Sequence, residues 1–263
     1  MSTAIPVALI SGGWAWYGRD TPREHSSVRS EELAELEDPG AHRTPLTSRR
    51  LARIVSDRDI LLLSFSYLCM NYTFYLLTFW SFLYLIQERH FSGIGSGFAG
   101  MIPWLGAAAG AAVGGVLADR VAKRLGARWG YRIIPLISLP IVAVLLLWTV
   151  SVNAPWLAVL GLAGAFGAVE VNEGAYWAAT MRIARADTGA ATGVLNTGGN
   201  LGGIVCQPVV AALSSAGNWR FAFVTGAVLA IVAAVLWLLV NIDDSQKTTA
   251  ILAALPVFDA GMS

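Results

Sequence analysis

Residues 100–124 read GMIPWLGAAAGAAVGGVLADRVAKR, and this stretch decides the fold. Its first part is apolar and free of charge, and glycines recur in it every four residues, at Gly106, Gly110 and Gly114. Small residues at this spacing lie on one side of a helix and let two helices pack closely in lipid. Basic residues then follow abruptly. This order is typical of a membrane span that ends at the cytoplasmic surface.

The whole chain has the composition of a membrane protein. Of its 263 residues, 56% are hydrophobic and 13% are charged, whereas about 25% are charged in an ordinary soluble domain. Six apolar runs are long enough to cross a bilayer. They are approximately Ile60–Ile86, Gly97–Leu117, Ile133–Val150, Trp156–Met181, Ala190–Leu213 and Phe221–Val240. We therefore expect an all-α membrane protein with six transmembrane helices.

The basic residues predict the orientation of this bundle. All but Arg89 and Arg220 of the 18 lysines and arginines precede the first run or follow the second, fourth or last. Because basic residues stay on the cytoplasmic side, both termini are expected there, in a bacterial inner or plasma membrane. Residues 59–241 would form the bundle, and residues 242–263 a cytoplasmic tail.

The segment before the bundle divides into two parts. Residues 1–18 are apolar but short for a span and interrupted by two glycines, so we interpret them as the remnant of a preceding transmembrane helix. Residues 19–58 are polar and are expected to form a cytoplasmic linker. The sequence SSVRSEELAELED at residues 26–38 predicts one short surface helix in this linker.

Few features favour an enzyme, a cofactor or a metal. Residues 95–100 spell GxGxxG, but no strand precedes them and a membrane-length helix follows, so a dinucleotide fingerprint is excluded. The two cysteines lie in apolar runs, and the three histidines lie in separate loops. We expect no catalytic residue, no cofactor and no metal. The net charge of +1 gives no reason to expect a nucleic-acid partner.

The predicted loop from Gly114 to Arg124 has a more specific interpretation than positive charge alone. A fixed carboxylate at Asp119 could meet the positive N-terminal end of a neighbouring helix, in a contact made in one conformation and broken in another. The loop resembles the signature loop of the major facilitator superfamily. The resemblance implies a conformational gate, formed here by Gly115, Asp119, Arg120 and Arg124.

Four stretches narrow this resemblance to the anion:cation symporter group, which imports sugar acids and other organic anions. They are WAWYGRDTPREHSSVRSEEL (14–33), FWSFLYLIQERHFSGIGSGFAGMIPWLGAAAGAAVGGVLADR (79–120), GAYWAATMRIARADTGAATGVLNTGGNLGG (174–203) and GNWRFAF (217–223). They are similar to the end of that group's helix six, helices seven and eight, and helices ten to twelve. The resemblance implies that this chain is only the second half of a twelve-helix transporter, whose cavity lies between the halves.

Polar residues recur on one face of the first and fifth runs. Lipid offers them no partner, so they must face protein or water. They either line a cavity that binds substrate or form hydrogen bonds between helices, worth about 0.6 kcal/mol each. The candidates for the cavity are Asn71, Tyr75, Thr78, Asn196, Asn200 and Gln207, with Trp177 of the fourth run.

Glu170 and Glu173 lie one helical turn apart inside the fourth run, toward the cytoplasmic side of the midplane. Burial and mutual repulsion favour the neutral form of at least one, which would let the pair carry a proton. Three interpretations remain open: a proton-coupling site, a gate with Arg128 or Arg132, or groups wetted by a vestibule. An anionic substrate also needs a cation or helix N-termini, and no Lys or Arg lies within the six runs.

The sequence thus predicts half of a secondary active transporter, with proton-coupled symport of hexuronates, aldonates or small carboxylates. Its expected partners are the organic anion, protons, the bilayer, and a second six-helix half or another copy of the chain. The alternative is a truncated, non-transporting remnant or a membrane interaction scaffold. A remnant would tolerate replacement of the polar faces, whereas a transporter would not.

Overall fold

The structure is a computed structural model that describes residues 4–19, 22–30, 33 and 46–242. The chain divides into two compact units, Met1–Pro45 and Leu46–Ser263. In the first unit, helix α1 (Ala4–Tyr17) is followed by the 3-10 turn η1 (Pro22–Glu24). The surface helix predicted at residues 26–38 lies largely outside the described residues, as does nearly all of the predicted tail. The account of residues 1–18 as a remnant stays a prediction.

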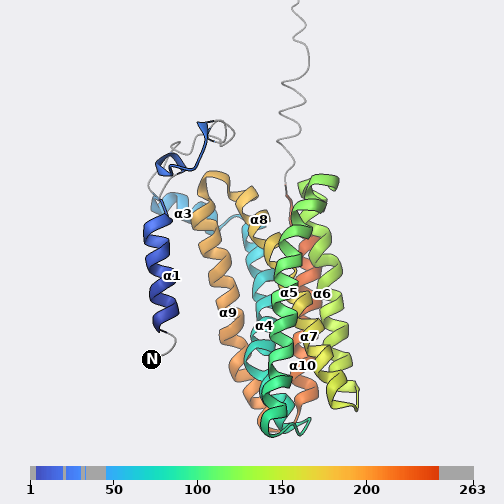
Figure 1. The fold of residues 1–263 in the computed structure, drawn as a ribbon. Coiled ribbons are helices and arrows are strands. Elements are labelled where there is room, and N and C mark those ends of the chain that lie inside the picture. Colours follow the sequence, from blue (N-terminus) through green and yellow to red (C-terminus); the bar gives the residue numbers. More distant parts are fainter. Residues whose placement is uncertain (1–3, 20–21, 31–32, 34–45, 243–263) are drawn as a thin grey trace, which may run out of the picture. The chain divides into compact units, whose positions relative to one another are not determined.

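The second unit is a bundle of long helices (Figure 1). A short helix, α3 (Ser48–Val55), precedes it. Each predicted apolar run is helical, and the fourth run is divided into two helices. The long elements are α4 (Arg58–Gln87), α5 (Gly93–Leu125), α6 (Ala127–Ser151), α7 (Pro155–Glu170), α8 (Glu173–Ala184), α9 (Thr188–Ser215) and α10 (Trp219–Leu239), with the 3-10 turn η2 (Arg185–Asp187) before α9. The prediction of an all-α membrane protein is confirmed.

Five segments of the described chain are long and apolar enough to cross a membrane. They are α4, α5, α6, α10 and the segment Pro155–Ala184 that contains α7 and α8. Helix α9 is not among the five, although its 28 residues make it long enough. Its threonines, asparagines and glutamine lower its hydropathy. The chain is therefore a multi-pass membrane protein in which one bundle helix is more polar than the others.

Helix α4 lies between α9 and α10 and packs against both (Figure 1). Helix α10 in turn packs on α6, α6 on α7, and α7 on α5. The contact between α5 and α7 confirms the role expected for the glycines. An added Cβ at Gly110 would lie 2.1 Å from the carbonyl oxygen of Gly167, and one at Gly106 would lie 2.2 Å from that of Ala163. The two backbones therefore touch where these glycines lie.

The structure corrects three boundaries. Gly114–Arg124 is not a loop: α5 continues through it to Leu125, because no glycine or proline follows Gly115 before Gly126. The fourth run is not one continuous helix, since it is interrupted at Val171 and Asn172. The predicted linker also contains the ordered helix α3, for which its Arg-rich sequence gave no expectation.

Candidate functional site

Helix α9 presents three different faces. One face is glycine-rich and packs on α4, where an added Cβ at Gly202 would lie 2.2 Å from the carbonyl oxygen of Leu68. A second face is apolar and exposed, at Leu201, Ile204 and Val205. Between them, Asn196 and Asn200 expose their carboxamides. Lipid cannot satisfy such groups, so this polar face must meet water or another protein surface.

Two hydrogen bonds join this polar face to α4. The Tyr75 hydroxyl donates to Oδ1 of Asn200 over 3.0 Å, while the Asn200 amide donates to the Asn196 carbonyl oxygen over 2.8 Å. Farther along, the Trp80 indole N–H donates to Oε1 of Gln207 over 3.0 Å. The structure therefore brings together predicted cavity residues from two runs that are more than a hundred positions apart in sequence.

A hollow of about 450 Å³ lies beside the hydrogen bond between Trp80 and Gln207. It is lined by Phe79, Trp80, Leu83 and Gln207. A neighbouring hollow of about 550 Å³ shares Trp80 and Leu83 and reaches Glu88 and Trp219. Both lie toward the ends of α4 and α9 that face away from α3, on the side predicted to be extracytoplasmic. The polar face of α9 thus continues from Asn200 to Gln207 at the first of these hollows.

The interruption between α7 and α8 is stabilised by one buried side chain. The Asn172 amide donates to the carbonyl oxygens of Ala168 and Val169, at 2.8 and 3.1 Å. Its Oδ1 accepts a 2.6 Å hydrogen bond from the Ser138 hydroxyl of α6. Asn172 therefore satisfies carbonyl groups at the end of α7, as an interrupted membrane helix requires. The interruption is a built feature of the fold.

Glu173 begins α8 directly after this interruption. Its carboxylate accepts hydrogen bonds from the Tyr67 hydroxyl, 3.0 Å from Oε2, and from the Trp177 indole N–H, at 2.8 Å. The N-terminal end of a helix also favours a negative charge. Two donors and a helix terminus therefore converge on one carboxylate between α4 and α8. We call Tyr67, Glu173 and Trp177 the carboxylate cluster.

Glu170 has a different environment, although it is only three residues earlier. It is half-buried at the end of α7, and within the described part of the chain its carboxylate makes no hydrogen bond or ion pair. Arg132, one of the two arginines considered as its gate partner, is buried and donates to the carbonyl oxygen of Val240 at the end of α10. This conformation therefore contains no gate between Glu170 and Arg132.

The remaining predicted residues are not gathered at the carboxylate cluster. Asn71 is buried and donates to the carbonyl oxygen of Tyr67 on its own helix, at 3.0 Å. The Thr78 hydroxyl is buried without a partner among the described residues. The predicted gate residues lie exposed on the last turns of α5; they are Gly115, Asp119, Arg120 and Arg124. In the described structure Asp119 makes no ion pair, so its gate role stays a prediction.

Sequence reasoning missed Tyr67, Trp80, Ser138 and Asn172. Helical spacing could have found Tyr67, which lies one turn from Asn71 on the polar face already recognised. Asn172 lies between Glu170 and Glu173 in the sequence, and a third polar residue inside this apolar run was a visible signal of a functional or structural site. No local pattern pairs it with Ser138, because that contact depends on how α6 packs on α7.

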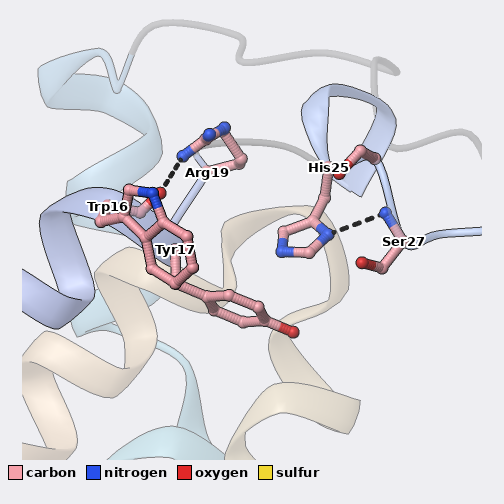
Figure 2. Close-up of a pocket in the computed structure, with 6 residues that line it drawn as sticks. Trp16, Tyr17, Arg19, His25 and Ser27 are labelled. Carbon is pink, nitrogen blue, oxygen red and sulfur yellow. Dashed lines mark hydrogen bonds between the residues drawn. The ribbon is translucent and has the colours of Figure 1, made fainter.

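A separate hollow of about 230 Å³ lies in the N-terminal unit, where Trp16, Tyr17, Arg19, His25 and Ser27 surround it (Figure 2). The Arg19 guanidinium donates to the carbonyl oxygens of Trp16 and Gly18 and so caps the end of α1. Nδ1 of His25 accepts from the backbone N–H of Ser27. The polar groups of this hollow thus bond one another within their own unit.

Comparison with known protein families agrees with this architecture. The model of the Major Facilitator Superfamily matches residues 2–125 and 121–256. The chain belongs to the Major Facilitator Superfamily. The resemblance seen in the sequence is therefore confirmed, and the bundle from α4 to α10 is a six-helix unit of that family.

Several curated relatives carry names of anion transporters. The chain is 26% identical to the chloroplastic sodium-dependent phosphate transport protein 1 of Arabidopsis thaliana, over 85% of this chain and 44% of the relative. It is 28% identical to a probable sulfoacetate transporter of Cupriavidus necator, over 78% of this chain and 49% of the relative. It is 25% identical to the chloroplastic ascorbate transporter of Arabidopsis thaliana, over 85% of this chain and 42% of the relative. The chain thus spans less than half the length of these relatives.

Proposed function

We propose that this chain transports anions across a membrane as one of two six-helix units. The observation that carries the proposal is the polar face of α9, where the carboxamides of Asn196 and Asn200 are exposed on a membrane helix. A lipid-facing helix would not keep such groups. In an alternating-access carrier, the corresponding face borders the substrate pathway between two helical units.

The chemistry of this face defines the class of substrate. Tyr75, Asn200 and Gln207 offer hydroxyl and carboxamide groups, which hydrogen-bond hydroxyl and carboxylate oxygens. The six apolar runs contain no Lys or Arg, so the substrate's charge would be bound by a helix N-terminus or by a cation of the second unit. The proposed substrates are small organic anions such as hexuronates, aldonates and small carboxylates. Names of relatives add ascorbate, sulfoacetate and phosphate as candidates.

The carboxylate cluster is the proposed site of proton coupling. Glu173 contacts α4 through Tyr67 and its own helix through Trp177, so gain or loss of its proton changes contacts between two helices. Glu170 lacks such contacts within the described structure and is the weaker candidate. The orientation with both termini in the cytoplasm, and a bacterial inner or plasma membrane, are part of the same proposal.

Uptake of labelled anions tests the proposal. Membrane vesicles that contain the chain are expected to accumulate labelled glucuronate, gluconate, ascorbate or sulfoacetate, and to do so faster with an inward proton gradient. Accumulation by vesicles of the purified chain would identify the second unit as another copy. Accumulation in native membranes alone would identify a separate chain. Folded, inserted protein that supports no uptake in either preparation would contradict the proposal and favour the remnant or scaffold.

A further inference from the structure

Helix α3 has two opposite faces, although it is only eight residues long. Leu51 and Val55 are one turn apart and are 40% and 45% exposed. Arg49 and Arg53 are also one turn apart and lie exposed on the other side. The Thr47 hydroxyl accepts from the backbone N–H of Arg50 and fixes the start of the helix. An apolar face opposite a basic face is typical of a helix that lies in a membrane interface.

A third side of α3 is attached to the bundle. Ile54 is buried in a small cluster with Ile60 of α4 and Ala191 of α9. The Arg50 guanidinium pairs with Asp187, just before α9, over 2.5 Å. These contacts hold the helix in one orientation, so the exposure of Leu51 and Val55 belongs to the fold and is not the result of a detached segment.

The chain connection places α3 close to the membrane surface. Only Ser56 and Asp57 separate it from α4, and two residues span at most about 7 Å. The Asp57 carboxylate caps α4 by accepting from the backbone N–H groups of Asp59 and Ile60, at 2.9 and 3.0 Å. Because the apolar run begins at Ile60, α3 lies next to the boundary of the bilayer, beside the ends of α4 and α9 (Figure 1).

We propose that α3 binds the anionic membrane surface. Leu51 and Val55 enter the boundary between headgroups and acyl chains, while Arg49 and Arg53 bind the phosphates of anionic phospholipids. The charges are complementary, since this end of the bundle carries most of the basic residues of the chain and the cytoplasmic leaflet is negative. The proposal does not depend on anion transport. Because Arg50 of α3 pairs with Asp187, a movement of α3 on binding lipid would also move the start of α9.

The test uses the full chain with Val55→Cys as its single cysteine, after replacement of the buried Cys69 and Cys206, and with a fluorescent label that senses its surroundings. The protein is placed in neutral detergent and in nanodiscs that contain brominated phosphatidylcholine or brominated phosphatidylglycerol. Bromine quenches a label that touches the lipid, and iodide quenches one that touches water. Leu51→Cys repeats the measurement at a second position.

We expect iodide to reach the label in detergent and brominated lipid to quench it in nanodiscs, with about fivefold preference for phosphatidylglycerol. Arg49→Gln with Arg53→Gln should abolish the preference. Arg120→Gln with Arg124→Gln removes an equal charge from exposed arginines of α5 and should preserve it. A label shielded from iodide in detergent would mean that protein covers this face. A label unquenched by either lipid, or quenched equally by both, would also overturn the proposal.

Discussion

The Gly110→Ala variant is expected to unfold at a markedly lower temperature than the unsubstituted protein. The Gly115→Ala variant should be as stable as that protein or slightly more stable. Alanine normally stabilises a helix by about 1 kcal/mol relative to glycine. At Gly115 no atom lies within 4 Å of the added Cβ, so only this gain remains. At Gly110 the added Cβ would lie 2.1 Å from the carbonyl oxygen of Gly167. The same substitution should therefore have opposite effects five residues apart.

The loss of stability in Gly110→Ala arises because backbone atoms of Gly167, and not a flexible side chain, occupy the space that the added Cβ needs. Helix α5 would have to move away from α7, which also disturbs the contacts of Gly106 with Ala163 of α7 and of Gly114 with Val171, just after α7 ends. Overpacking of this kind costs about 1–3 kcal/mol and occasionally more. The larger Gly110→Leu should prevent accumulation of folded protein.

Thermal unfolding of the purified variants in detergent, followed by size-exclusion chromatography, measures both effects. Both substitutions add the same methyl group to the same helix, so differences in helix propensity cancel. Equal unfolding temperatures for Gly110→Ala and Gly115→Ala would contradict the close contact between α5 and α7.

Glu173→Gln is expected to reduce proton-driven anion uptake to the level of vesicles without the protein. Glutamine keeps the size of the side chain and one oxygen that accepts from Tyr67 or Trp177, but it cannot bind and release a proton. Exchange of labelled for unlabelled anion across the membrane needs no net proton movement, so it should persist in this variant. The two assays together separate proton coupling from folding.

Glu170→Gln is the matched control, because it makes the same chemical change three residues earlier. It should reduce uptake less, since Glu170 lacks the two donors that bind Glu173. Loss of exchange as well as uptake in Glu173→Gln would show that the carboxylate holds the helices in place. Proton-driven uptake that survives Glu173→Gln would remove this residue from the coupling mechanism.

The sequence predicts the helices of this fold well, because membrane-length apolar runs leave the backbone few alternatives to a helix. The glycine contact between α5 and α7 was also predicted, since its spacing is visible in the chain. The interruption after Glu170 was not predicted. No glycine or proline marks it, and it depends on Asn172, whose side chain bonds the end of α7 and Ser138 of α6.

The candidate site was predicted in part. Helical spacing identified Tyr75 and Asn200, which the structure joins by a hydrogen bond. The spacing could not distinguish Glu170 from Glu173, since both lie in the same apolar surroundings of the sequence. Their difference comes from Tyr67 on another helix, which contacts only the second glutamate. Such contacts depend on how the helices pack, and local sequence does not specify them.

The most direct test of the central claim is the reactivity of single cysteines on α9 in membranes. Asn200→Cys lies on the polar face of α9, whereas Val205→Cys, five residues further on, lies on the apolar exposed face across the helix. If the polar face borders an anion pathway, a membrane-impermeant thiol reagent should modify Asn200→Cys, and a transported anion should slow the reaction. Val205→Cys, facing lipid, should stay unmodified. An Asn200→Cys as unreactive as Val205→Cys, or a reaction that no candidate anion slows, would contradict the account.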